Sequence, residues 1–343
     1  MGQWNYLTPE KTVVIFGATG SIGAYATLDI QKKGFIPIAV GFRKNDNHFF
    51  LTKGITYISL DIKEKKNFFL LPKQVYAVVN LAGAMPAKMK IYNPQEYIDS
   101  ITTGTLNVLE YCVRANAKKI VFSQSISDII HLYGSTKPIP ADCEMKFPLN
   151  NDHSIYSICK NAAVNLIEHY HAKYGLKRYI LRFPNIYLYH PNPYYYVDGT
   201  KKMQSYRYLI EQAMKGESIE MWGDPNIQRD IVYVKDCVQI ITKALQVNAE
   251  GGIYNVGTGV GTSFRKQIEG IIDIFSPENK KSKIIECPQK ENSPQYILDI
   301  SKTEKELGYQ PKYDYISYLI DFKNEMQKEP FKNLWGTRND YSL

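Results

Sequence analysis

The sequence predicts an α/β fold in which helices cover both faces of a parallel sheet and a smaller lobe follows. Short apolar runs alternate with helical patterns through the first half of the chain, which is typical of strand–helix–strand units. The runs are apolar at consecutive positions, as expected for strands buried on both faces. With 343 residues, 44% of them hydrophobic, the chain can form one large domain of Rossmann-type, doubly wound topology and a second, smaller C-terminal lobe.

The expected strands are short and rich in aliphatic residues. In chain order they are residues 12–16, 36–40, 56–60, 77–81, 120–123 and 179–182, and residues 253–256 return to the same sheet. Helical patterns occupy residues 22–33, 97–115, 205–214 and 238–247.

The alternation of strands and helices ends after Pro184, where a stretch rich in tyrosine, proline and asparagine follows at 187–196. We therefore expect the smaller lobe to begin here. The predicted Rossmann-type domain comprises residues 1–185 and about 230–258, and the smaller lobe comprises residues 186–229 and 259–330, with 331–343 as a tail.

Composition limits the class of protein. The five cysteines are widely spaced without a Cys-x-x-Cys pair, which argues against a disulfide framework and a zinc site, so we predict no metal and a reducing cytoplasm. No apolar run approaches the roughly 20 residues that span a bilayer. The net charge of +8 favours phosphorylated ligands or describes an ordinary lysine-rich surface, and no nucleic-acid recognition motif accompanies it.

A glycine-rich turn follows the first expected strand and begins the first expected helix. In this context glycine permits a tight turn and lets backbone N–H groups approach a pyrophosphate at the helix N-terminus. The turn therefore predicts a dinucleotide coenzyme. The expected contacts are Gly17, Thr19, Gly20, Ser21, Ile22 and Gly23.

The end of the second expected strand indicates which dinucleotide binds. An acidic residue there would bind the ribose 2′-OH of NAD, whereas arginine accommodates the 2′-phosphate of NADP. Arg43 and Lys44 stand at this point without a carboxylate, so we predict NADP. Asp46 lies close enough to keep NAD as the alternative, and a solvated basic loop would carry the same residues.

Tyr156 and Lys160 are four residues apart and would share one face of a helix. A free phenol has a pKa of about 10, and a neighbouring ammonium group would lower it toward neutrality. A serine at the end of a sheet strand, Ser125, could polarise the oxygen that reacts. The same spacing also occurs between ordinary neighbours on the surface of a helix.

Together these motifs resemble the extended short-chain dehydrogenase/reductases of the nucleotide-sugar epimerase/dehydratase type. The resemblance covers nearly the whole chain. Its matching stretches are residues 17–23 (GATGSIG), 61–62 (DI), 80–84 (NLAGA), 104–110 (GTLNVLE), 123–125 (SQS), 156–160 (YSICK), 181–187 (LRFPNIY), 229–236 (RDIVYVKD), 254–257 (YNVG) and 299–302 (DISK).

The resemblance implies a role for each matching residue. Ser125 would polarise the reacting oxygen, Tyr156 would be the acid/base and Lys160 would tune it. The smaller lobe would bind a nucleotide-sugar, with Asn185 and Arg229 as substrate contacts, and the helical patterns 97–115 and 158–174 would form a homodimer interface. The further coenzyme contacts would be Asp61, Ile62, Leu81, Ala82, Gly83, Tyr156, Lys160 and Phe183.

Departures from the family pattern narrow the reaction. Dehydratases carry an Asp-Glu pair directly after the serine, and Ile126 and Ser127 stand here instead. We therefore do not expect dehydration. The predicted preference for NADP favours net reduction, so we predict an NADP-dependent reductase of a keto-sugar nucleotide. The alternatives are an epimerase that acts through a transient ketone with tightly held NAD(P), and a non-catalytic coenzyme-binding protein.

Four further residues are candidates for a second acid/base. A thiol beside a cationic group could exchange protons, although a free cysteine more often only packs. Loop histidines could also supply a proton. These candidates are Cys159, His131, His153 and His190.

Overall fold

A seven-stranded parallel sheet forms the centre of the fold, with strand order β13-β6-β5-β4-β1-β2-β3. The computed structural model describes residues 4, 7–197 and 199–341. The predicted α/β doubly wound fold is confirmed, and each predicted strand is present within three residues of its expected ends. The strands are β1 (Thr12–Phe16), β2 (Ile36–Gly41), β3 (Thr56–Ser59), β4 (Ala77–Asn80), β5 (Lys119–Ser125), β6 (Lys177–Phe183) and β13 (Gly251–Asn255).

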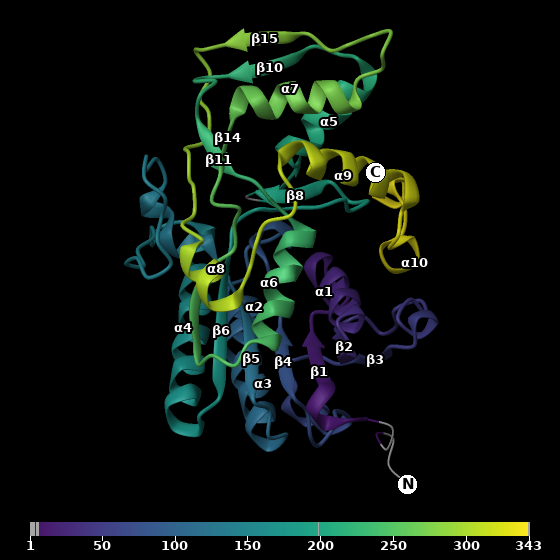
Figure 1. The fold of residues 1–343 in the computed structure, drawn as a ribbon, viewed down its shortest axis with the longest axis vertical. Helices are drawn as coiled ribbons and strands as arrows, with labels where there is room; N and C mark the ends of the chain where they lie inside the picture. The colour runs from purple at the N-terminus through teal and green to yellow at the C-terminus, as the bar shows by residue number, and fades with distance from the viewer. Residues whose placement is uncertain (1–3, 5–6, 198, 342–343) are drawn as a thin grey trace.

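Helices cover both faces of the sheet (Figure 1). Alternate residues of β1 face opposite layers: Val13 and Ile15 belong to one buried cluster, Val14 and Phe16 to the other. The first cluster includes residues of α1 (Ser21–Lys32) and α6 (Val234–Gln246), and the second includes residues of α3 (Gly104–Arg114) and α4 (Asp152–Tyr174). The consecutive apolar positions in the strands therefore reflect burial on both faces.

The helix predicted at 97–115 has an irregular start. It consists of α2 (Pro94–Tyr97), a π-helical turn at Ile98–Thr103 and then α3. Ser100 Oγ donates to the carbonyl of Glu96 at 2.6 Å and accepts from the backbone N–H of Ala84 at 2.9 Å. The π-helical turn is thereby tied to the loop that follows β4, and turns of this kind often lie at functional sites.

Apart from α6 and α8, most of the chain between β6 and β13 and after β13 forms a second group of elements, above the sheet in Figure 1. The helices are α5 (Ser205–Lys215), α7 (Phe264–Phe275) and α9 (Tyr315–Lys328). The strands pair as β7 (Ile186–Tyr187) with β12 (Val232–Tyr233), β8 (Tyr194–Val197) with β9 (Thr200–Met203), β10 (Ile219–Trp222) with β15 (Ile284–Cys287), and β11 (Gln228–Asp230) with β14 (Gly261–Ser263).

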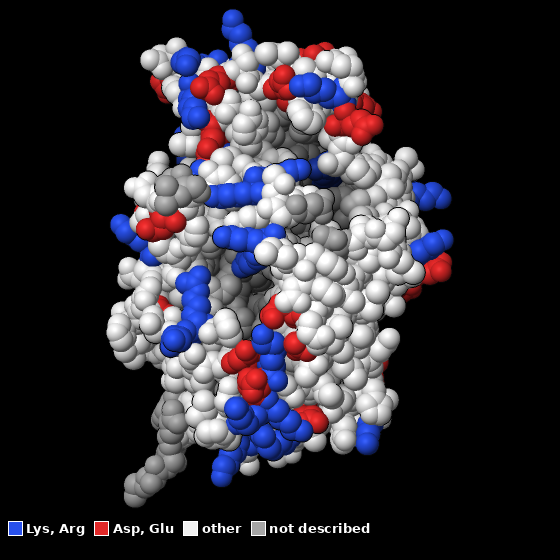
Figure 2. All heavy atoms as spheres, turned by 180° about the vertical axis from the view of Figure 1, so that it is seen from behind, with Lys and Arg blue, Asp and Glu red and all other residues white. Residues whose placement is uncertain are grey.

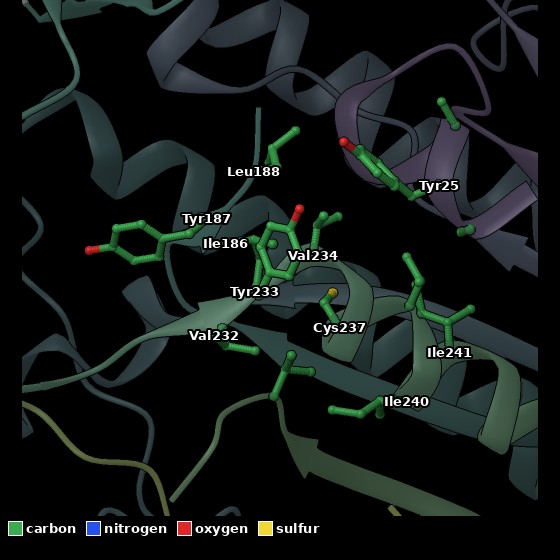
Figure 3. Close-up of a cluster of buried hydrophobic side chains, with 14 of the residues drawn as sticks. Tyr25, Ile186, Tyr187, Leu188, Val232, Tyr233, Val234, Cys237, Ile240 and Ile241 are labelled. Atoms are coloured by element: carbon green, nitrogen blue, oxygen red, sulfur yellow. The ribbon is translucent and has the colours of Figure 1, made fainter. Parts of the chain in front are cut away.

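The two groups of elements share one hydrophobic cluster. Tyr233 of β12 and Cys237 of α6 lie between β7 and Tyr25 of α1 (Figure 3). The position of the upper elements is therefore fixed by the same core that covers the sheet.

Short elements complete the chain. They are α8 (Ser301–Leu307), which contacts β13 and α6, α10 (Lys332–Trp335), and the 3₁₀ turns η1 (Pro9–Lys11), η2 (Leu51–Lys53), η3 (Lys65–Leu70), η4 (Pro86–Lys88), η6 (Ile126–Leu132) and η7 (Arg338–Tyr341). Among the described residues, no helix is both long and apolar enough to span a bilayer.

Candidate active site

The structure brings Ser125, Tyr156 and Lys160 together at the carboxyl end of β5. Ser125 is the last residue of this strand, and its hydroxyl accepts from the backbone N–H of Ser127 at 3.2 Å. The phenol of Tyr156 and the hydroxyl of Ser125 form a hydrogen bond. Both Tyr156 and Lys160 are buried. The geometry required of the three predicted residues is therefore present, and their chemical roles stay predictions.

Three hydrogen bonds fix α4 against the end of β5. Lys160 Nζ donates to the carbonyl of Ser123 at 2.6 Å. The side chains of Gln124 and Asn161 are joined at 2.9 Å, and those of Ser157 and Ser127 at 2.8 Å. Asn151 caps the helix in a reciprocal capping box with Ser154. These contacts hold one face of α4 in register with the end of the strand.

The pKa values of the pair differ from the sequence-based expectation. Burial raises the pKa of Tyr156 to about 12, although its hydrogen bond to Ser125 acts in the opposite direction. Burial also lowers the pKa of Lys160 to about 7. The expected lowering of the Tyr156 pKa by an ammonium neighbour is thus wrong for this structure. The reason is that burial also disfavours the charged form of Lys160, whose Nζ donates to the carbonyl of Ser123.

The glycine-rich turn leaves no room for a side chain at Gly17 or Gly23. Gly17 has a φ of +81°, and a Cβ there would lie 2.9 Å from the backbone N of Ala82. A Cβ on Gly23 would lie 2.1 Å from the carbonyl oxygen of Gly17. Gly20 is the N-cap of α1, and Ser21 and Ile22 form its first turn. The turn therefore fits a pyrophosphate, with backbone N–H groups of a 12-residue helix at its edge.

The end of β2 contains the residues that were expected to choose the dinucleotide. Arg43 Nη1 donates to the carbonyl of Leu334, and the exposed Lys44 follows it. Asp46 is buried and accepts from the backbone N–H of Phe50 at 2.6 Å. The carboxylate of Asp46 therefore closes its own loop from a buried position.

The remaining predicted coenzyme contacts lie at the same edge of the sheet. Asp61 follows β3 and accepts from the backbone N–H of Lys63 at 3.0 Å, beside the buried Ile62. Phe183 ends β6 directly opposite Ser125 in the strand register. Leu81, Ala82 and Gly83 follow β4, where Gly17 and the buried Ile101 approach them.

The predicted substrate residues Asn185 and Arg229 both lie near Tyr187. The side chain of Asn185 forms a hydrogen bond with the Tyr187 phenol, and the positive charge of Arg229 acts on the same phenol. Arg229 Nη2 donates to the carbonyl of Ser293 at 3.0 Å. Asp230 is occupied elsewhere, since it accepts from Thr258 N–H at 2.7 Å.

An important buried ion pair was not predicted from the sequence. Arg182 of β6 and Asp128 of η6 are 0% and 1% exposed, and their closest N–O distance is 3.0 Å. Arg182 also donates to the carbonyl of Ala141 at 2.8 Å. Asp128 lies three residues after Ser125, so this pair fixes the turn that carries the serine. The signal in the sequence is a charged residue, Arg182, within an apolar strand.

The additional acid/base candidates lie elsewhere or are unsuited to proton exchange. Burial raises the pKa of Cys159, which keeps the thiol protonated. Burial lowers the pKa of His190 to about 3, and its ring lies against Trp335. His131 bonds the carbonyl of Lys146 at 2.8 Å, and His153 is at the start of α4. Among the described contacts of Ser125, Tyr156 and Lys160, none is made by these three histidines.

Three comparisons with known proteins show which family and which fold this chain shares. The sequence profile of the NAD dependent epimerase/dehydratase family matches residues 13–257. A putative UDP-glucose 4-epimerase of Methanocaldococcus jannaschii is 28% identical over 309 residues, covering 88% of this chain and 94% of that protein.

Two solved structures share the fold. A UDP-glucose 4-epimerase of Thermotoga maritima, crystallised with UDP-glucose, has a TM-score of 0.75 at 23% identity, covering 93% of this chain and 99% of that chain. A UDP-glucose 4-epimerase of Thermus thermophilus in complex with NAD has a TM-score of 0.71 at 21% identity, covering 91% of this chain and 98% of that chain.

Proposed function

Because the chain belongs to the NAD dependent epimerase/dehydratase family, we propose that it is a nucleotide-sugar epimerase that acts through a transient ketone. The observation that carries this proposal is the hydrogen-bonded pair of Ser125 and Tyr156 at the edge of the sheet where the glycine-rich turn lies. The resemblance to extended short-chain dehydrogenase/reductases is confirmed by the family match.

The relatives support the epimerase over the reductase that the sequence favoured. Both solved structures and the archaeal relative described above carry the name UDP-glucose 4-epimerase. We therefore propose a UDP-sugar as the substrate and NAD as the coenzyme. Arg43 and Lys44 at the end of β2 are the specific observation that keeps an NADP-dependent reductase as the second candidate.

The chain supplies the proton transfers of the proposed reaction. A nicotinamide coenzyme held by the glycine-rich turn would supply the hydride acceptor and donor for the sugar carbon. Tyr156 takes the proton of the sugar hydroxyl during oxidation and gives it back during reduction. Ser125 hydrogen-bonds the same oxygen. Lys160, in its charged form, stabilises the phenolate that takes the proton at the start of oxidation and forms again after reduction.

The protonation state of Tyr156 follows from its burial. With a pKa raised to about 12, the phenol carries its proton at neutral pH and is ready to donate to a ketone. Because the pKa of Lys160 is about 7, small changes in its surroundings change the charge of this side chain at neutral pH. The phenol therefore holds its proton more tightly than Lys160 does, and removal of the sugar proton by Tyr156 requires Lys160 in its charged form.

Arg229 is suited to a diphosphate. Its guanidinium is held by the carbonyl of Ser293 and retains its positive charge, which it can offer to phosphate oxygens. On the face seen in Figure 2, Lys and Arg side chains gather around a hollow between the sheet and the upper elements. The net charge of +8 gives the whole chain a bias toward anionic ligands.

The test is interconversion without added reductant. The purified protein is incubated with UDP-glucose, UDP-N-acetylglucosamine and UDP-glucuronic acid, and the sugar products are identified by NMR. An epimerase converts one of these to its C4 epimer while the total of oxidised and reduced coenzyme released on denaturation stays constant. Turnover that occurs only with stoichiometric consumption of NADPH would select the reductase instead.

A further inference from the structure

The C-terminal residues 331–341, called the strap from here on, lie against the predicted coenzyme-binding residues. The strap includes α10 and η7, and it follows α9 toward the end of β2 and the start of α1 (Figure 1). It lies outside residues 13–257, the part of the chain that matches the family. Its contacts are therefore a property of this chain that the family match does not explain.

Three hydrogen bonds join the strap to the coenzyme side of the sheet. Trp335 Nε1 donates to the carbonyl of Thr19 in the glycine-rich turn at 3.0 Å. Arg43 Nη1 donates to the carbonyl of Leu334. Asn47 Nδ2 donates to the carbonyl of Asn333 at 3.0 Å. Two of these partners, Thr19 and Arg43, are predicted coenzyme contacts.

The strap is packed on both sides. Trp335 is 3% exposed, and its ring centroid lies 4.3 Å from that of Phe331 and 4.6 Å from that of His190. Phe331 contacts Tyr25 of α1 with 4.5 Å between ring centroids. The strap thus bridges the first helix of the sheet domain and the loop after β7, and leaving this position would expose large aromatic rings.

The surroundings of His190 are strongly positive. Burial, together with the charges of Lys88, Arg207 and Arg43, lowers the pKa of this histidine to about 3. Arg207 is buried, and its Nε has no hydrogen-bond partner within the described part of the chain. The strap therefore covers a region whose field favours an anion such as a diphosphate.

We propose that Arg43 anchors the strap, and that the closed strap retains a dinucleotide whose adenosine ribose carries no 2′-phosphate. This inference rests on the proposed function, because an epimerase recovers its coenzyme in every turnover and gains from keeping it bound. Arg43 was predicted to bind the 2′-phosphate of NADP. In the structure its guanidinium donates to the strap, so Arg43 favours NAD over NADP.

The preference follows from competition for one guanidinium. A 2′-phosphate would form charge-assisted hydrogen bonds with Arg43, which are stronger than a bond to a neutral carbonyl. Arg43 would then release Leu334 and the strap would open. NAD has no such group at this position, and the anchor stays in place.

The experiment measures how fast bound NADH is displaced by excess NAD, followed by NADH fluorescence. Arg43→Gln keeps most of the side-chain length and removes the charge, and we expect release about tenfold faster, the effect of one lost hydrogen bond on a dissociation rate. Lys332→Gln is the matched control, because Lys332 is an exposed cation on α10 and should leave the release rate unchanged. Equal release rates for wild type, Arg43→Gln and Lys332→Gln would overturn the proposal.

A second measurement uses Trp335 itself. Acrylamide quenching of its fluorescence, with the signal of Trp335→Phe subtracted, should rise on addition of NADPH and not of NADH. Trp335→Phe also removes the indole N–H donor while keeping an aromatic ring, so faster NADH release in this variant supports the strap even where Arg43→Gln does not fold. NADH release from Trp335→Phe at the wild-type rate, together with quenching that NADPH does not change, would contradict the proposed strap.

The two proposals fail in different ways. A protein that epimerises a UDP-sugar but shows no effect of Arg43 or Trp335 on NADH release keeps its proposed function and loses the strap. A wild-type protein that binds neither dinucleotide contradicts the proposed function itself.

Discussion

Replacing Asp128 by asparagine should destabilise the protein more than any exposed charge change. Three N–H···O contacts of 3.0 to 3.2 Å join the Arg182 guanidinium to the carboxylate, and both side chains are almost fully buried. Asparagine offers one oxygen and leaves the arginine charge uncompensated. Breaking a buried pair in this way costs about 3–5 kcal/mol.

The expected change in melting temperature follows from the size of the chain. A protein of this length has an unfolding entropy of about 0.7 kcal/mol per degree, so the loss corresponds to a decrease in Tm of roughly 4–7 °C. Differential scanning calorimetry at pH 7 measures it. Because Asp128 fixes the turn after Ser125, we also expect a decrease in kcat.

Glu286→Gln is the matched control. Glu286 pairs with Arg265 at 2.6 Å, but the two side chains are 65% and 40% exposed. An exposed pair contributes at most about 1 kcal/mol, which is a Tm change of roughly 1 °C. Similar changes for Asp128→Asn and Glu286→Gln would refute the reasoning that burial makes the Asp128 pair important.

Three further changes test other parts of the structure. Burial lowers the pKa of Lys160 from 10.5 to about 7, so the unfolded chain binds this proton more tightly and stability falls as the pH drops from 10.5 toward 7. Lys160→Met should flatten the dependence of Tm on pH in this window, and a dependence unchanged from wild type would contradict the burial effect. Gly23→Ala should weaken NAD binding by about tenfold or more in calorimetric titration, because its Cβ would overlap the Gly17 carbonyl. Gly34→Ala is the control: open space surrounds its Cβ, so this change should lower stability and leave NAD binding unchanged. Ile158→Glu should convert the predicted homodimer to a monomer in light scattering, since Ile158 is 44% exposed on α4; a monomeric wild type would end that prediction.

The strands and the glycine-rich turn could be predicted from sequence because their signals are local. An apolar run such as residues 12–16, followed by glycines at fixed spacing, already defines a strand, a turn and a helix start. The spacing of Tyr156 and Lys160 likewise requires only that the segment be helical. The structure agrees with each of these expectations.

The contacts that could not be predicted join residues far apart in the chain. Asp128 and Arg182 are 54 positions apart, and Arg43 and Leu334 are 291 apart. No periodicity or short motif predicts which residues that are distant in sequence come into contact. The pKa of Lys160 could not be predicted from sequence either. It depends on the burial of this side chain between α4 and β5 and not on its spacing from Tyr156.

Turnover by Tyr156→Phe tests the central claim most directly. Phenylalanine keeps the ring that packs against Tyr97, with 5.9 Å between ring centroids, and removes only the hydroxyl that bonds Ser125. We predict that epimerisation of the UDP-sugar slows by about 10²–10⁴-fold while the amount of NAD bound per chain stays the same. Epimerisation at the wild-type rate in this variant would show that another group transfers the proton.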